Sequence, residues 1–157
     1  MSSQNKIESL TSSVESIVSY PIPNPELTSL KSQLPPPYAK KKLAFILGHG
    51  LWSDLSLSKS LQWLDAVLES TPGPYPRLFV TPNAAGKAKP DEWLVSQGNK
   101  ALRVFEESMK IEAAKRGIEI LGTWNMSIQG DVRDGVHLGI GGNLVKAMMV
   151  LNWLNML

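Results

Sequence analysis

Short apolar runs alternate with long helical segments from residue 42 onward, and this alternation constrains the fold more than any other feature of the chain. The runs 42–47, 76–82 and 118–124 are short and apolar, as expected of buried strands. The segments between them, 55–70 and 91–117, combine helical apolar spacing, acidic residues near a helix start and a glycine stop. Strands separated by helices of this length pair in parallel with right-handed crossovers. The sequence therefore predicts an α/β sandwich with about three strands, which is a thin sheet.

The two ends of the chain differ from this central pattern. Residues 1–40 are rich in Ser and Pro and carry one weak helical pattern, so we expect a lead-in that is partly disordered or packed on the domain. Residues 41–157 form the predicted domain. Its last parts are a predicted loop over 125–139 and an apolar helix over 142–156 that we expect to face the core.

Composition excludes several classes of function. A net charge of +2 without a basic stripe does not favour nucleic-acid binding. The absence of cysteine excludes disulfides and thiolate metal sites, and the two histidines lack a metal-binding spacing, so we expect no metal and no cofactor. The N-terminal residues lack a basic start followed by an apolar stretch, so we expect no secretory signal peptide, and no run of about 18 apolar residues predicts a membrane span. The compartment stays unknown.

The segment "RDGVHLG" at residues 133–139 holds the first candidate site. Asp134, Gly135 and His137 can bring a carboxylate to one imidazole nitrogen and leave the other nitrogen to act as a base. The alternative is purely structural: Asp134 caps a turn, Gly135 takes a positive φ, and His137 starts the helix. The spacing alone does not decide between the two.

The segment "LGHGLW" at residues 47–52 holds the second candidate site. Gly48, Gly50 and His49 could direct backbone N–H groups and an imidazole at a substrate oxygen, as in an oxyanion hole. Alternatively, the glycines permit a tight turn between strand and helix, with Trp52 packed over its end. Both histidines follow predicted strands, where polar groups gather in open α/β sheets, so we expect them to meet.

Together these segments resemble SGNH (GDSL-like) hydrolases, and within them the PC-esterase branch of polysaccharide and sialate O-acetyltransferase-like proteins. The resemblance lies in "GHGLW", in "GTWNMSIQGDVRDGVHLGIGG" and in the helix that follows, and it covers about residues 40–157. It implies a flavodoxin-like three-layer α/β/α fold. By the same resemblance His137 is the general base, Asp134 orients it, and "GHGLW" with Asn125 contributes to the oxyanion or substrate site.

One departure from the family is large. The family's nucleophile lies in an N-terminal G-D-S block after a first strand, and this sequence contains neither the block nor that strand. Ser53 is the nearest serine to the predicted site, and we expect it to be a helix N-cap. Asn125 also begins an N-glycosylation sequon, although a glycan there would crowd the site.

The resemblance therefore predicts the C-terminal portion of an acyl esterase or carbohydrate O-acyltransferase that is inactive alone, so whether the chain is itself an enzyme stays uncertain. The main alternative is a non-catalytic module that binds a carbohydrate or an acyl ester. A third is an esterase that uses an unusual serine such as Ser53. In the first case the edge of strand 42–47 is uncovered, and the isolated chain is expected to unfold without a cooperative transition or to associate through that edge. Members of the family are often anchored in membranes of the secretory pathway.

Overall fold

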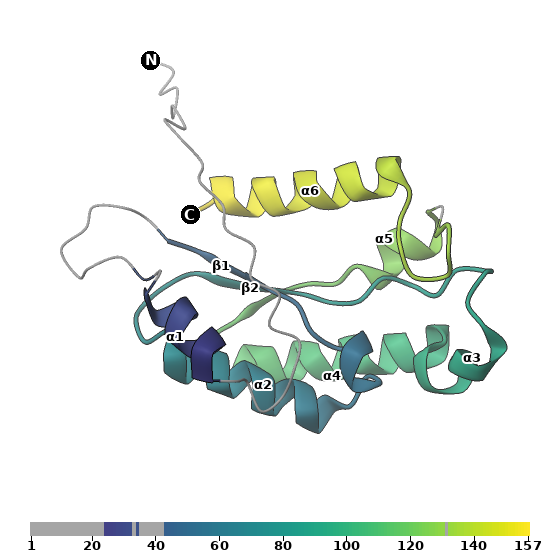
Figure 1. Cartoon of the computed structure of the whole chain (residues 1–157). Helices are drawn as coiled ribbons and strands as arrows, with labels where there is room; N and C mark the ends of the chain where they lie inside the picture. Colours follow the sequence, from purple (N-terminus) through teal and green to yellow (C-terminus); the bar gives the residue numbers. More distant parts are fainter. Residues whose placement is uncertain (1–23, 33, 35–42, 131) are drawn as a thin grey trace, which may run out of the picture.

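The computed structural model describes residues 24–32, 34, 43–130 and 132–157. Three short strands form one parallel sheet in the order β1-β2-β3, with bounds Phe45–Leu47, Arg77–Val80 and Glu119–Leu121. Helices cover both of its faces (Figure 1). The predicted α/β sandwich with about three parallel strands in a three-layer arrangement is thus confirmed.

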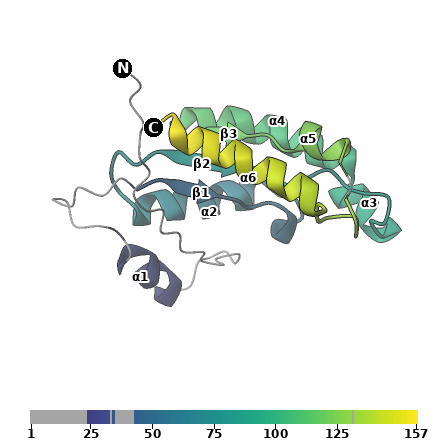
Figure 2. The same ribbon diagram turned by 90° about the horizontal axis from the view of Figure 1, so that it is seen from above.

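Topology explains which helix covers which face. The chain steps from β1 to β2 and from β2 to β3 in the same direction, so right-handed crossovers bring both connecting helices to one face. These helices are α2 (Leu57–Ser70) and α4 (Asn99–Lys115), which lie together below the sheet in Figure 1. The opposite face carries α6 (Ile140–Asn155), which runs over the strands in Figure 2. One face of the sheet is therefore thickly covered and the other thinly.

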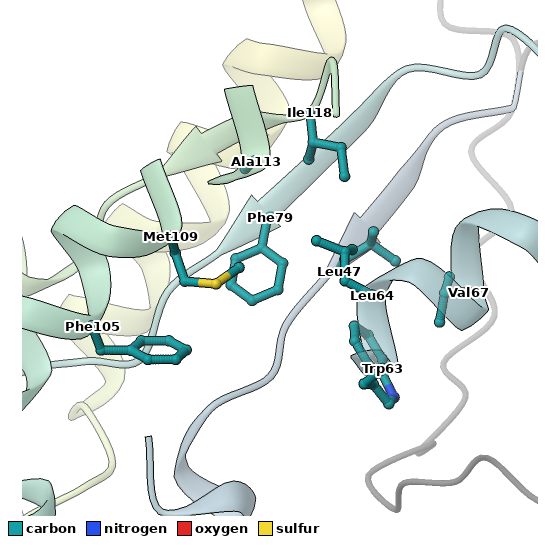
Figure 3. Close-up of a cluster of buried hydrophobic side chains, with 9 residues drawn as sticks. All are labelled: Leu47, Trp63, Leu64, Val67, Phe79, Phe105, Met109, Ala113 and Ile118. Atoms are coloured by element: carbon teal, nitrogen blue, oxygen red, sulfur yellow. The ribbon is translucent and has the colours of Figure 1, made fainter. Parts of the chain in front are cut away.

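The hydrophobic core lies on the thickly covered face. Side chains from β1, β2, α2 and α4 interdigitate there (Figure 3), and Leu64, Phe79 and Met109 are completely buried. The core cluster comprises Leu47, Trp63, Leu64, Val67, Phe79, Phe105, Met109, Ala113 and Ile118. Burial of side chains of this size provides most of the free energy of folding, at about 1.5–3 kcal/mol for each large side chain.

Two local predictions need correction. The helix predicted over 91–117 is broken into α3 (Asp91–Gln97) and α4, because Gly98 is extended and a side chain there would overlap the carbonyl oxygen of Leu94. The predicted loop 125–139 contains the short helix α5 (Trp124–Ile128). Within the lead-in, α1 (Asn24–Ser32) begins next to Pro25, a residue that fits the first turn of a helix. The weak helical pattern of residues 7–18 lies outside the described residues.

The prediction that the last helix faces the core is largely wrong. Only Trp153 of α6 is buried, and its indole N–H donates to Glu119 of β3 at 3.0 Å. Most other apolar side chains of α6 are exposed: Ile140, Leu144, Val145, Met148 and Leu151. Within the described part of the chain, no helix combines the length and the apolar character that crossing a bilayer requires.

Candidate functional site

A groove lies at the carboxyl ends of β1 and β2 and joins the two segments that the sequence singles out. It has a volume of about 460 Å³, within the range of roughly 300–1,000 Å³ that is typical of small-molecule sites. The groove is lined by Ile46 of β1 and the "LGHGLW" segment, by residues 80–83 at the end of β2, and by Val136, His137 and, from α6, Lys146 and Val150. Both histidines lie here, as the positions of the strands predict.

Asp134 and His137 form a hydrogen-bonded pair at this groove. The Oδ2 atom of Asp134 lies 2.6 Å from Nδ1 of His137. The His137 side chain is 79% exposed and that of Asp134 is 58% exposed, so solvent reaches the pair. Hydrogen bonds from the His137 ring and from the backbone N–H groups of residues 137 and 136 hold the pKa of Asp134 well below its usual range. The carboxylate is therefore ionised and engages Nδ1, which leaves Nε2 for other chemistry.

Asp134 also caps a turn, which is the role that the structural alternative predicts for it. Its Oδ1 atom accepts from the backbone N–H groups of Val136 at 3.0 Å and His137 at 2.7 Å, which closes an Asx-type turn. Gly135 takes a positive φ of 84°, as that interpretation predicts. His137 does not start the helix, because α6 begins at Ile140. One oxygen thus shapes the turn while the other orients the imidazole.

The loop after β2 holds this turn in place. Gly86 donates its backbone N–H to the carbonyl oxygen of Gly135 at 3.2 Å. The side-chain amide of Asn83 donates to the carbonyl oxygen of Val136 at 3.3 Å. Asn99, the first residue of α4, binds both the N–H and the carbonyl of Ala85. The break at Gly98 brings Asn99 to that loop. The position of His137 therefore depends on the ends of β2 and α4.

The "LGHGLW" segment forms a tight turn and a buried polar chain. Gly50 takes a φ of 144° and is followed by the 3-10 turn η1 (Leu51–Ser53). His49 is 7% exposed, stacks on Trp63, and its Nδ1 lies 3.0 Å from the hydroxyl of Ser60. That hydroxyl is 3.2 Å from Ser53 Oγ, which donates to the carbonyl of Gly50 at 2.9 Å. These contacts tie His49 into the packing between β1 and α2.

The prediction that Ser53 is an N-cap is wrong, because α2 is capped by Ser56. Ser53 is buried in the chain of hydrogen bonds below the groove. Among the described residues, no serine hydroxyl hydrogen-bonds to His137. An arrangement in which His137 activates Ser53 is therefore not formed in this structure.

Of the remaining predicted residues, Trp52 and Gly48 line the groove and Asn125 does not. Trp52 lines the groove but is 81% exposed, so it does not pack over the end of the turn as the structural alternative predicts. Asn125 is exposed on α5 and does not line the groove. Its neighbour Trp124 is tied to Asn99 through the indole N–H at 3.2 Å. Gly48 lines the groove directly after β1.

Among the groove residues that sequence reasoning missed, Asn83 and Lys146 form a hydrogen bond with each other. Asn83 follows β2 in the same way as His49 follows β1, so the rule that polar groups gather at strand ends could have identified it. Lys146 is the seventh residue of α6, and no spacing in the sequence indicates that it reaches this groove. Its Nζ donates to Oδ1 of Asn83 at 3.2 Å.

Across the described residues, no three side chains of the His, Cys, Asp and Glu types gather closely enough to hold a metal ion. In comparisons with known proteins, the chain matches no family model, no curated protein and no solved structure.

Proposed function

We propose that this chain carries the acid and base of an SGNH/PC-esterase-like site for acyl-ester hydrolysis or transfer at a carbohydrate hydroxyl. The observation that supports this most directly is the 2.6 Å contact between Asp134 Oδ2 and His137 Nδ1 beside the groove. In such a site Asp134 orients the imidazole, and Nε2 takes the proton of an attacking hydroxyl. The Gly48–Gly50 turn supplies backbone N–H groups near the same groove for a developing oxyanion.

The described residues do not supply the nucleophilic serine that such a site needs. A base works only within hydrogen-bond reach of the proton that it takes. No described serine makes such a contact with His137, and the dyad is largely open to solvent. The proposed site is therefore half of a catalytic site, and a serine has to reach His137 from a segment with a G-D-S block.

The free edge of the sheet is the proposed place for that segment. In the described part of the chain β1 pairs only with β2, and Ile46 of β1 is 49% exposed. The groove begins at the carboxyl end of β1, so a further parallel strand beside β1 would end next to it. The exposed apolar side chains of α6 lie over the thinly covered face, where a helix of the added segment would pack. Without that segment, the same edge would serve self-association.

A second candidate function is a carbohydrate- or ester-binding module without turnover. The exposed ring of Trp52 and the apolar groove lining favour it, because they offer binding surface whether or not a nucleophile is present. Binding of this kind would survive His137→Ala, whereas catalysis would not.

Labelling with a fluorophosphonate, which reacts with activated serines, tests the proposal. We expect the purified chain to give no stoichiometric adduct by mass spectrometry. We expect a longer chain, which also includes the upstream coding sequence with the proposed G-D-S block, to be labelled on the serine of that block. This adduct should be lost in His137→Ala, because the imidazole activates the hydroxyl.

Two outcomes would contradict the proposal. A stoichiometric, His137-dependent adduct on Ser53 in the chain alone would mean a complete esterase. An upstream sequence without a G-D-S block, together with no labelled serine, would remove the ester-transfer proposal and leave the binding module. A melting curve of each variant serves as the control for folding.

A further inference from the structure

The groove holds Lys146, a cation that no acidic side chain of the described residues balances. Lys146 of α6 lines the groove, and its Nζ donates to a neutral acceptor, Oδ1 of Asn83, at 3.2 Å. None of the ion pairs formed by the described residues includes Lys146. Within the described parts of the chain, no aspartate or glutamate lines the groove either. A half-buried ammonium without a carboxylate partner is costly, and it is normally balanced by an anion.

The surroundings of Lys146 are suited to an anionic ligand. Desolvation lowers the pKa of its ammonium, so the charged form gains from any anion that approaches. The side-chain amide of Asn83 donates to the carbonyl oxygen of Val136, and its Oδ1 accepts from the ammonium of Lys146. These two hydrogen bonds hold the ammonium on the side of the groove where His137 lies. The dyad carboxylate of Asp134 is engaged by His137 and by two backbone N–H groups, and it does not line the groove.

The remaining walls of the groove are neutral. Ile46, Val80, Val136 and Val150 give apolar surface, and Trp52 adds an aromatic face at the rim. A ligand that fits has an anionic group at one point and a compact, largely uncharged body. The volume of about 460 Å³ accommodates a ligand of the size of one or two sugar rings.

We propose that Lys146 binds the carboxylate of an acidic sugar, so that the groove accepts uronic or related sugar acids in preference to neutral sugars. This inference rests on the proposed function and narrows its substrate class. Lys146 binds and positions the anionic substrate, and His137 remains the base. A phosphate group has the same charge chemistry, and the test distinguishes the two.

Binding is measured with matched small sugars on the full chain, with the indole N–H signal of Trp52 in NMR spectra as the reporter. The probes are methyl β-D-glucuronide, methyl β-D-glucoside and inorganic phosphate. We expect the glucuronide to bind about tenfold more tightly than the glucoside, since a charge-assisted hydrogen bond contributes about that much. Inorganic phosphate should compete only weakly, and added salt should weaken glucuronide binding.

Variants of the lysine complete the test. Lys146→Met should weaken glucuronide binding about tenfold and glucoside binding much less, because the charged contact serves only the acid, whereas the hydrogen bond to Asn83 is lost for both sugars. Lys146→Arg should restore the preference for the acid. Lys100→Met, at an exposed lysine outside the groove, is the matched control and should change nothing.

Three results would overturn the inference. They are equal affinity for the two sugars, no binding of the glucuronide, and a glucuronide affinity that Lys146→Met leaves unchanged. Tighter binding of phosphate than of glucuronide would replace the sugar acid with a phosphorylated ligand. None of these results depends on a nucleophile, so a failure here is distinguishable from a failure of the labelling experiment.

Discussion

Replacing Glu106 with alanine is expected to lower the free energy of unfolding by about 3 kcal/mol, because a buried hydroxyl and a part-buried backbone N–H would lose their acceptor. Glu106 is 5% exposed and accepts from the hydroxyl of Thr81 at 2.7 Å and from the backbone N–H of Trp124 at 3.2 Å. Its other oxygen lies 2.9 Å from Nζ of Lys110. This carboxylate therefore joins the ends of β2 and β3 to α4. Chemical denaturation followed by circular dichroism measures the loss.

The next residue provides the control. Glu107 is exposed and pairs with Arg103 on the surface, so Glu107→Ala should change stability by no more than about 0.5 kcal/mol. Equal effects of the two substitutions would contradict the role of Glu106.

The pH dependence of stability provides a second test of the role of Glu106. Burial raises the pKa of its carboxyl, but hydrogen bonds from Thr81, Lys110 and Trp124 outweigh burial and lower it. A pKa lowered by folding gives stability that is present above the unfolded pKa and lost as the pH falls through the folded pKa. The stability difference between the natural chain and Glu106→Gln should therefore shrink on acidification.

Replacing Gly135 with alanine is expected to cost about 2–4 kcal/mol and to displace His137. The residue takes a φ of 84°, a region that side chains disfavour. A Cβ there would also overlap the backbone N and Cα of Lys89, which cannot move without the loop after β2. Thermal and chemical denaturation measure the cost, and the His137 ring signals in NMR spectra measure the displacement.

Gly141 is the matched glycine for this comparison. It lies in α6, and a Cβ there would meet no atom within 4 Å. Gly141→Ala should therefore stabilise the chain by about 0.5–1 kcal/mol, since alanine favours a helix. A Gly135→Ala variant as stable as the natural chain would show that the turn around Asp134 adapts freely.

The sequence predicted the layers of this fold and missed most of its breaks. Apolar runs at 42–47 and 76–82 were sufficient to identify β1 and β2, because strand burial depends on local composition. The break at Gly98 depends on contact with the carbonyl of Leu94, which helical periodicity does not reveal. The exposure of α6 follows from the direction of the crossovers, which periodicity cannot reveal either.

The candidate site also has a part that the sequence could predict and a part that it could not. The contact between Asp134 and His137 is local, three residues apart, so the spacing could suggest it. Asn83 and Lys146 meet across 63 residues of sequence, and only the fold brings them together. The buried chain from His49 through Ser60 to Ser53 likewise depends on how α2 packs against β1. Long-range polar contacts such as these were beyond single-sequence reasoning.

The tautomer of His137 tests the central proposal, that Asp134 presents this imidazole as a base, most directly. Two-bond couplings between ring nitrogens and carbon-bound protons reveal which nitrogen is protonated when the ring is neutral. We expect the proton on Nδ1, held by Asp134, and a free Nε2, with the proton moved to Nε2 in Asp134→Asn because the amide can donate to Nδ1. A proton on Nε2 in the natural chain, or the same mixture in both proteins, would contradict the assignment of His137 as a base.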